Sequence, residues 1–205
     1  MKNDKKQSSD TASLHGSAPD KSPVALLLID VINDLDFDRG AELLDFALPM
    51  AERIAELKSR ARAEKIPVIY VNDNFGRWRS DFNAQVEHCL RPDCLGRPIA
   101  ELLKPERDDY FVLKPKHSGF FSTTLDTLLE YLSVKVVILT GIASNICVLF
   151  TANDAYMRDL QVVVPTDCVA ANTQADSDYA IEQMKQVLKA DTRLSTELTL
   201  SQFKK

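Results

Sequence analysis

The chain has 205 residues and a formal net charge of −5 at pH 7, and 45% of its residues are hydrophobic. This length suits one compact α/β domain rather than two. The mild negative charge gives no electrostatic reason to expect nucleic acid or an anionic membrane surface as a partner. No apolar stretch reaches the roughly 20 residues that a membrane-spanning helix requires.

Residues 1–23 are rich in Lys, Asp and Ser and contain few apolar side chains. Such a segment cannot bury enough surface to offset its ordering entropy, so we expect a disordered tail followed by a single domain over residues 24–205. The tail lacks the apolar core of a secretory signal. The four cysteines (Cys89, Cys94, Cys147 and Cys168) are therefore expected to be reduced thiols in a cytoplasmic protein.

From residue 24 onward, buried strands alternate with amphipathic helices. The pattern predicts strands at residues 24–30, 66–72, 110–114, 136–140, 161–165 and 192–195, and helices at 42–65, 81–90, 98–103, 122–132, 145–158 and 177–190. This alternation predicts an α/β fold, a three-layer doubly wound six-stranded parallel sheet with strand order 3-2-1-4-5-6. In such sheets, ligands bind beyond the carboxyl ends of the strands.

Three chemically capable side chains follow strands at that edge: Asp30, Lys114 and Cys147. A carboxylate can take the proton of a thiol, and an ammonium group beside both favours their ionised forms. Ser144 and Asn145 are good N-cap residues, so Cys147 should lie in the first turn of a helix, where the helix dipole favours a thiolate. Taken singly, these residues could equally be a loop acid, a solvated lysine and a packed core thiol.

Three segments around these residues resemble the motifs of the isochorismatase-like cysteine hydrolase family, over roughly residues 24–195. They are LLLID followed by Asn33-Asp34, then VLKPKHSGFF, then GIASNICVLFTANDA. The resemblance implies a catalytic triad of Asp30, Lys114 and Cys147. It also implies a cis peptide bond between Ile142 and Ala143, an oxyanion hole formed by the N–H groups of Ala143 and Cys147, and a homo-oligomer of two or more copies.

The chain departs from the family pattern at two places. Ile32 stands where family members often have Gln, which weakens any inferred substrate contact there. Nicotinamidases of the family carry a metal site near the second strand, but residues 72–76 contain no histidine, so we predict no metal and disfavour nicotinamide as substrate. True isochorismatases cleave a vinyl ether and lack the cysteine, so Cys147 points to carbonyl chemistry.

The sequence thus predicts a cofactor-independent cysteine hydrolase that cleaves a small amide-like C–N bond through a thioester. Candidates for lining its pocket are Asn74, Trp78, His117, Phe120 and Asn145. The alternatives are a catalytically silent binding or regulatory protein on the same scaffold, and a vinyl-ether hydrolase. A zinc site at residues 88–94 is disfavoured because a second ligand pair is missing.

Overall fold

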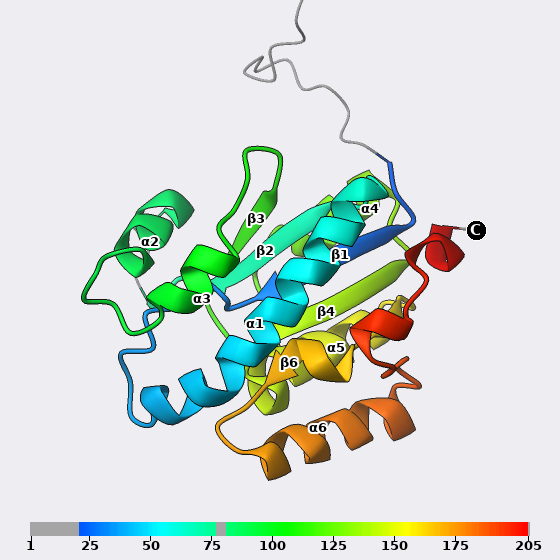
Figure 1. The fold of residues 1–205 in the computed structure, drawn as a ribbon. Helices are drawn as coiled ribbons and strands as arrows, with labels where there is room; N and C mark the ends of the chain where they lie inside the picture. Colours follow the sequence, from blue (N-terminus) through cyan, green and yellow to red (C-terminus); the bar gives the residue numbers. More distant parts are fainter. Residues whose placement is uncertain (1–20, 77–80, 205) are drawn as a thin grey trace, which may run out of the picture.

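The computed structural model describes residues 21–76 and 81–204, and the described part has the predicted α/β architecture (Figure 1). Its strands are β1 (Val24–Ile29), β2 (Val68–Asp73), β3 (Tyr110–Lys114), β4 (Val136–Ile142), β5 (Gln161–Val163) and β6 (Val169–Ala170). They form a parallel sheet in the order β3-β2-β1-β4-β5, with β6 paired to the end of β4. The predicted fold class is therefore confirmed.

Helices cover both faces of this sheet. The helices are α1 (Gly40–Ala63), α2 (Phe82–Cys89), α3 (Arg97–Leu102), α4 (Leu125–Leu132), α5 (Leu149–Tyr156) and α6 (Gln174–Val187). Leu26 and Leu28 of β1 pack with α1, α2 and α3, whereas Leu27 and Ile29 pack with α4, α5 and α6. Successive side chains of a strand point to opposite faces. A strand covered on both faces must therefore be apolar throughout, as β1 is.

The last strand of the sheet differs from the prediction. Residues 192–195 do not form the sixth strand: Asp191 makes one isolated bridge to Val163, and Ser195–Glu197 is a short 3-10 helix. The Asp167 carboxylate accepts hydrogen bonds from the N–H and the hydroxyl of Ser195, both at 2.7 Å, and so holds that segment in a turn. The true sixth strand, β6, has only two residues, which is too short for a periodic pattern to reveal.

Gly141 allows β4 to run close beside the end of β1. Its φ is +111°, and a Cβ atom placed there would lie 2.0 Å from the carbonyl oxygen of Ile29. Only glycine tolerates this backbone conformation and this approach. The chain after β4 therefore starts directly beside the residue that follows β1, which is Asp30.

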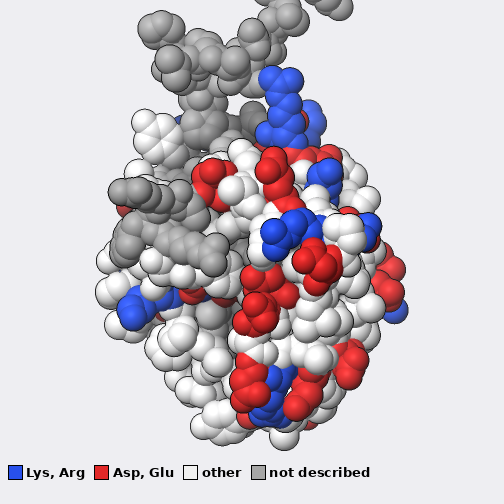
Figure 2. Space-filling model, turned by 90° about the vertical axis from the view of Figure 1, so that its left-hand side faces the viewer, with Lys and Arg blue, Asp and Glu red and all other residues white. Residues whose placement is uncertain are grey.

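Charged side chains of both signs are interspersed over the described surface shown in Figure 2. Helix α1 has 24 residues but carries acidic and basic side chains along its length. Within residues 21–76 and 81–204, no helix is both long enough and apolar enough to cross a membrane.

A buried lysine fastens α1 to the segment that precedes β3. The Lys58 ammonium donates to the Tyr70 hydroxyl and to the Lys104 carbonyl, both at 2.9 Å, and lies 3.2 Å from the Asp109 carboxylate. The Tyr70 hydroxyl in turn donates to the Leu103 carbonyl at 2.7 Å. Buried charges are stabilising only when paired in this way.

Replacing Lys58 by Met should lower the free energy of unfolding by about 2–3 kcal/mol, because the buried Asp109 carboxylate then loses a cationic partner and keeps its ion pair with Arg62. Chemical denaturation measures this change. Arg53→Met is the matched control, since it breaks an exposed ion pair with Glu56 on the same helix and should cost less than about 1 kcal/mol. Equal losses in the two variants would contradict the importance of the Lys58 network.

Candidate active site

Asp30, Lys114 and Cys147 meet at the carboxyl edge of the sheet. The Lys114 ammonium lies 2.8 Å from Asp30 Oδ2 and 3.5 Å from Cys147 Sγ. Lys114 comes from β3, Asp30 follows β1, and Cys147 follows β4, so the lysine side chain reaches across the end of β2. Lys114 is fully buried, Asp30 is nearly so, and Cys147 is partly buried. The structure thus brings together the three side chains that the sequence singled out.

Asp30 is held by its backbone and by its side chain. Its φ of +53° turns the chain sharply at the end of β1, and an Asp residue tolerates this left-handed conformation better than most. Its N–H donates to the Val71 carbonyl at 3.0 Å. Its Oδ1 accepts the N–H of Asp73 at 2.7 Å. The other carboxylate oxygen is thereby left to Lys114.

Cys147 lies in a widened helical turn, Ser144–Val148, that continues directly into α5. The peptide bond between Ile142 and Ala143, just before this turn, is cis. The predicted N-cap role of Ser144 or Asn145 is wrong, because the residue at the start of the turn is Ala143 and makes no side-chain cap. Ser144 instead places its hydroxyl 3.1 Å from that of Ser177 in α6, which ties the turn to a neighbouring helix.

The loop after β3 is fixed against the helix that carries Cys147. The Gly119 N–H donates to the Thr151 hydroxyl at 3.0 Å, and that hydroxyl donates to the Cys147 carbonyl at 2.7 Å. His117, on the same loop, is exposed and places Nδ1 4.0 Å from Cys147 Sγ. Its ring packs on Phe150 with a centroid separation of 5.4 Å. The sulfur therefore lies between a buried ion pair and an exposed imidazole.

The other residues expected to line a pocket do not gather at one place in the structure. Asn74 is buried, and its side chain accepts the Gly76 N–H at 2.9 Å. Phe120 is buried in the core beside α4 and α5, with the Arg158 guanidinium 4.5 Å from its ring centroid. Asn145 is partly buried in the Cys147 turn. Trp78 lies outside the described residues. His117 is the predicted pocket residue that contacts the Cys147 sulfur.

Sequence reasoning missed Asp73, the last residue of β2. Its Oδ2 lies 3.4 Å from the Lys114 ammonium. The signal that could have found it is positional. It ends the strand that lies between β1 and β3, so its side chain reaches the same edge as Asp30 and Lys114.

A cavity of about 470 Å³ opens between the loop after β1, the loop after β2 and helix α2. It is lined by Asp34, Asp36, Phe37, Phe75, Ala84, Gln85, His88 and Cys89. Gln85 donates to the Asp73 carbonyl at 3.0 Å, so the cavity wall adjoins the cluster. His88 pairs with Asp34 at 3.0 Å. In the described part of the chain, no group of three or more His, Cys, Asp or Glu side chains is arranged to hold a metal ion.

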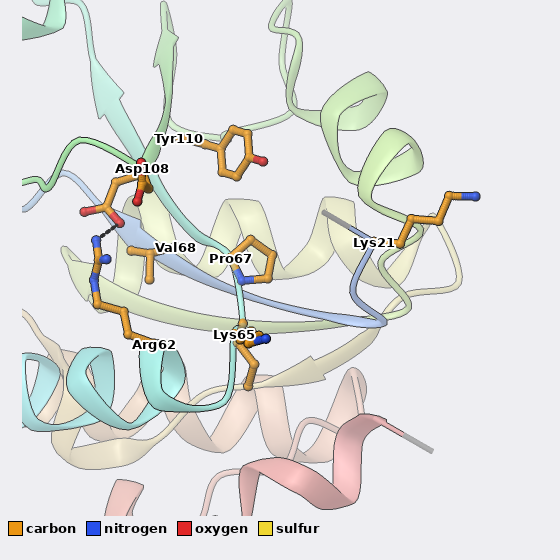
Figure 3. A pocket seen from close by; sticks show the side chains of 9 residues that line it. Lys21, Arg62, Lys65, Pro67, Val68, Asp108 and Tyr110 are labelled. Atoms are coloured by element: carbon orange, nitrogen blue, oxygen red, sulfur yellow. Dashed lines mark hydrogen bonds and ion pairs between the residues drawn. The ribbon is translucent and has the colours of Figure 1, made fainter. Parts of the chain in front are cut away.

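A second cavity, of about 490 Å³, lies at the opposite edge of the sheet (Figure 3). Its walls come from the starts of β2 and β3 and from the end of α1, and they include Lys21, Lys65 and Tyr110. Arg62 in this wall is paired with Asp109. Because ligands of such sheets bind at the carboxyl ends of the strands, this cavity is not part of the candidate active site.

The charges in the cluster set its resting protonation. Burial raises the pKa of Asp30, and Lys114 offsets part of that rise. Burial and the Asp30 charge raise the pKa of the Cys147 thiol to about 12, against the influence of Lys114. Burial alone would lower the pKa of Lys114, but Asp30, Cys147 and Asp73 together raise it. Burial and the Asp30 charge thus oppose ionisation of the thiol, whereas Lys114 favours it.

Fold and site together define an α/β protein with an Asp–Lys–Cys cluster at the carboxyl edge of a parallel sheet. The family model described as the isochorismatase domain matches residues 24–194. This match covers most of the chain, so the chain belongs to the isochorismatase family of hydrolases.

Several proteins resemble the chain along most of its length. The uncharacterized isochorismatase family protein YaaI of Bacillus subtilis is 43% identical over 171 residues, covering 83% of this chain and 93% of its own. The ureidoacrylate amidohydrolase RutB of Pantoea ananatis is 34% identical over 76% of this chain and 71% of its own. The crystal structure of N-carbamoylsarcosine amidase from Thermoplasma acidophilum has a TM-score of 0.68 at 27% identity, covering 86% of this chain and 98% of that one.

Replacing Asp30 by Asn should make Cys147 more reactive toward iodoacetamide. The substitution removes the negative charge that helps to raise the thiol pKa and leaves Lys114 beside the sulfur. A fall of one pKa unit gives about tenfold faster alkylation below the pKa. Mass spectrometry of the peptide that contains Cys147 measures the rate across pH 7–10. Asp93→Asn, at an exposed acid, should leave the rate unchanged, and slower alkylation in Asp30→Asn would contradict the prediction.

Proposed function

We propose that this protein is a cofactor-independent cysteine hydrolase that cleaves a small amide-like C–N bond through a thioester at Cys147. The observation that carries the proposal is the position of the Lys114 ammonium, 2.8 Å from Asp30 and 3.5 Å from the sulfur. Relatives named as an amidohydrolase and an amidase support amide chemistry. A metal ion is not part of the proposed reaction.

In the first half of the proposed reaction, Asp30 accepts the Cys147 proton as the sulfur attacks the carbonyl carbon of the substrate. The raised pKa of Asp30 makes its carboxylate a stronger base than an exposed one. The N–H groups of Ala143 and Cys147 hold the developing oxyanion. Protonated Asp30 then gives its proton to the leaving nitrogen, the C–N bond breaks, and a thioester and a free amine or ammonia result.

In the second half, water attacks the thioester while Asp30 accepts a proton from it. The C–S bond breaks, the carboxylic or carbamic acid leaves, and Asp30 returns the proton to the sulfur. Lys114 remains an ammonium throughout and orients the carboxylate and the sulfur toward each other. His117 lies on the exposed side of the sulfur, where the substrate and then the water would arrive.

The proposed substrate is a small molecule rather than a polymer, and the proposed enzyme works in the cytoplasm as a homo-oligomer. Primary amides, ureas and N-carbamoyl compounds carry the required bond. A panel of these compounds, assayed for ammonia release with mass spectrometry of the protein, tests the proposal. Turnover accompanied by an acyl adduct on Cys147 supports it. Turnover with no adduct at any time in a rapid-quench series would contradict the thioester route.

Replacing Cys147 by Ala should reduce turnover by at least about three orders of magnitude, because the nucleophile is lost while the fold keeps its packing. Cys94→Ala is the matched control, since Cys94 is a partly buried thiol on the loop after α2 and should leave turnover within about twofold of the wild type. Ammonia release is the measurement for both variants. A Cys147→Ala enzyme that retains the wild-type rate would rule out the proposed nucleophile.

A further inference from the structure

Asp73 makes contacts with two members of the cluster at once. Its backbone N–H donates to Asp30 Oδ1 at 2.7 Å, and its own Oδ2 lies 3.4 Å from the Lys114 ammonium. No other carboxylate in the described part of the chain is paired with Lys114 except Asp30. Asp73 thus contributes one backbone contact to the base and one charge contact to the cation.

Neighbouring groups hold the Asp73 side chain in this orientation. The Phe75 N–H donates to Asp73 Oδ1 at 2.7 Å, which leaves Oδ2 to face Lys114. The Gln85 side chain donates to the Asp73 carbonyl at 3.0 Å. These two hydrogen bonds hold the carboxylate and the backbone carbonyl of Asp73. The carboxylate is therefore positioned before any substrate arrives.

The proposed reaction removes the charge of Asp30, the other carboxylate paired with Lys114. When Asp30 takes the thiol proton and the sulfur bonds to carbon, both are momentarily neutral. Lys114 is fully buried, and an unpaired buried ammonium is costly. Among the described residues, the groups that face Lys114 are Asp30 after β1, Asp73 at the end of β2 and Cys147 after β4, and of these three Asp73 takes no part in the proton transfer. His117 faces the sulfur from the loop after β3.

Resting on the proposed function, we propose that Asp73 is a positioning residue that supplies Lys114 with a permanent counter-charge while Asp30 is protonated. It acts through Lys114 and Asp30 and does not exchange a proton with the substrate. Its charge keeps Lys114 an ammonium, and its N–H keeps the Asp30 carboxylate turned toward Lys114.

Asp73→Asn removes the charge and the acceptor that faces Lys114, while the amide oxygen can still accept the Phe75 N–H and the backbone N–H remains. We expect kcat to fall by about tenfold or more, with KM changed by less than about threefold. The alkaline limb of the plot of kcat against pH should move to lower pH, because Lys114 loses its proton more readily without the Asp73 charge. Asp73→Glu restores the charge and should recover part of the rate. Glu56→Gln, which changes an exposed acid on α1, is the control and should match the wild type.

A measurement without substrate separates this proposal from the proposed function. With the Asp73 charge gone, Lys114 is less neutralised, so the pH midpoint for alkylation of Cys147 by iodoacetamide should fall in Asp73→Asn and stay unchanged in Glu56→Gln. If no amide in the panel is turned over, this shift alone still supports the charge contact. An unchanged alkylation midpoint overturns the proposal. A loss of rate with unchanged pH profiles and lower thermal stability also overturns it, because it would show a merely structural role.

Discussion

The central constraint in this protein is a single ammonium group with no access to water. Lys114 is buried completely, and a charge in that position persists only where opposite charges surround it. Asp30 and Asp73 provide those charges, and the Cys147 sulfur completes the shell. Each partner comes from a different strand end, so the ion pair also fixes how β1, β2, β3 and the turn after β4 meet at the carboxyl edge.

The packing of the sheet makes this meeting possible. A residue other than glycine at position 141 would collide with the Ile29 carbonyl, so the close approach of β4 to β1 depends on the missing side chain. The loop after β3 is tied to α5 through the Thr151 hydroxyl, which bonds both Gly119 and the Cys147 carbonyl. The nucleophile turn and the lysine loop therefore share one polar anchor, and neither can shift alone without breaking a buried hydrogen bond.

Hydrophobic periodicity predicted the sheet class, the usual topology of doubly wound sheets supplied the order β3-β2-β1-β4-β5, and the strand ends together with the family resemblance indicated the convergence of Asp30, Lys114 and Cys147. The sequence patterns did not predict features that depend on local geometry. The two residues of β6 are too few to show a period, and Ser195 is held in a turn by a side chain 28 positions earlier in the sequence. The raised pKa of Cys147 was not evident from the sequence, because burial and the Asp30 charge raise it against Lys114 and neither is visible in the sequence alone. Asp73 reads as an ordinary residue at the end of a strand until its neighbours are known.

The Cys147 sulfur has one dry side and one open side. Asp30 and Lys114 close the dry side, whereas His117 and the exposed ring of Phe150 border the open side. In the proposed reaction, the amine product must then leave, and the water must enter, on this exposed side of the sulfur. The amine product must therefore leave the site before water can attack the thioester. Any nucleophile small enough to enter in that interval, such as hydroxylamine, competes with water for the acyl group.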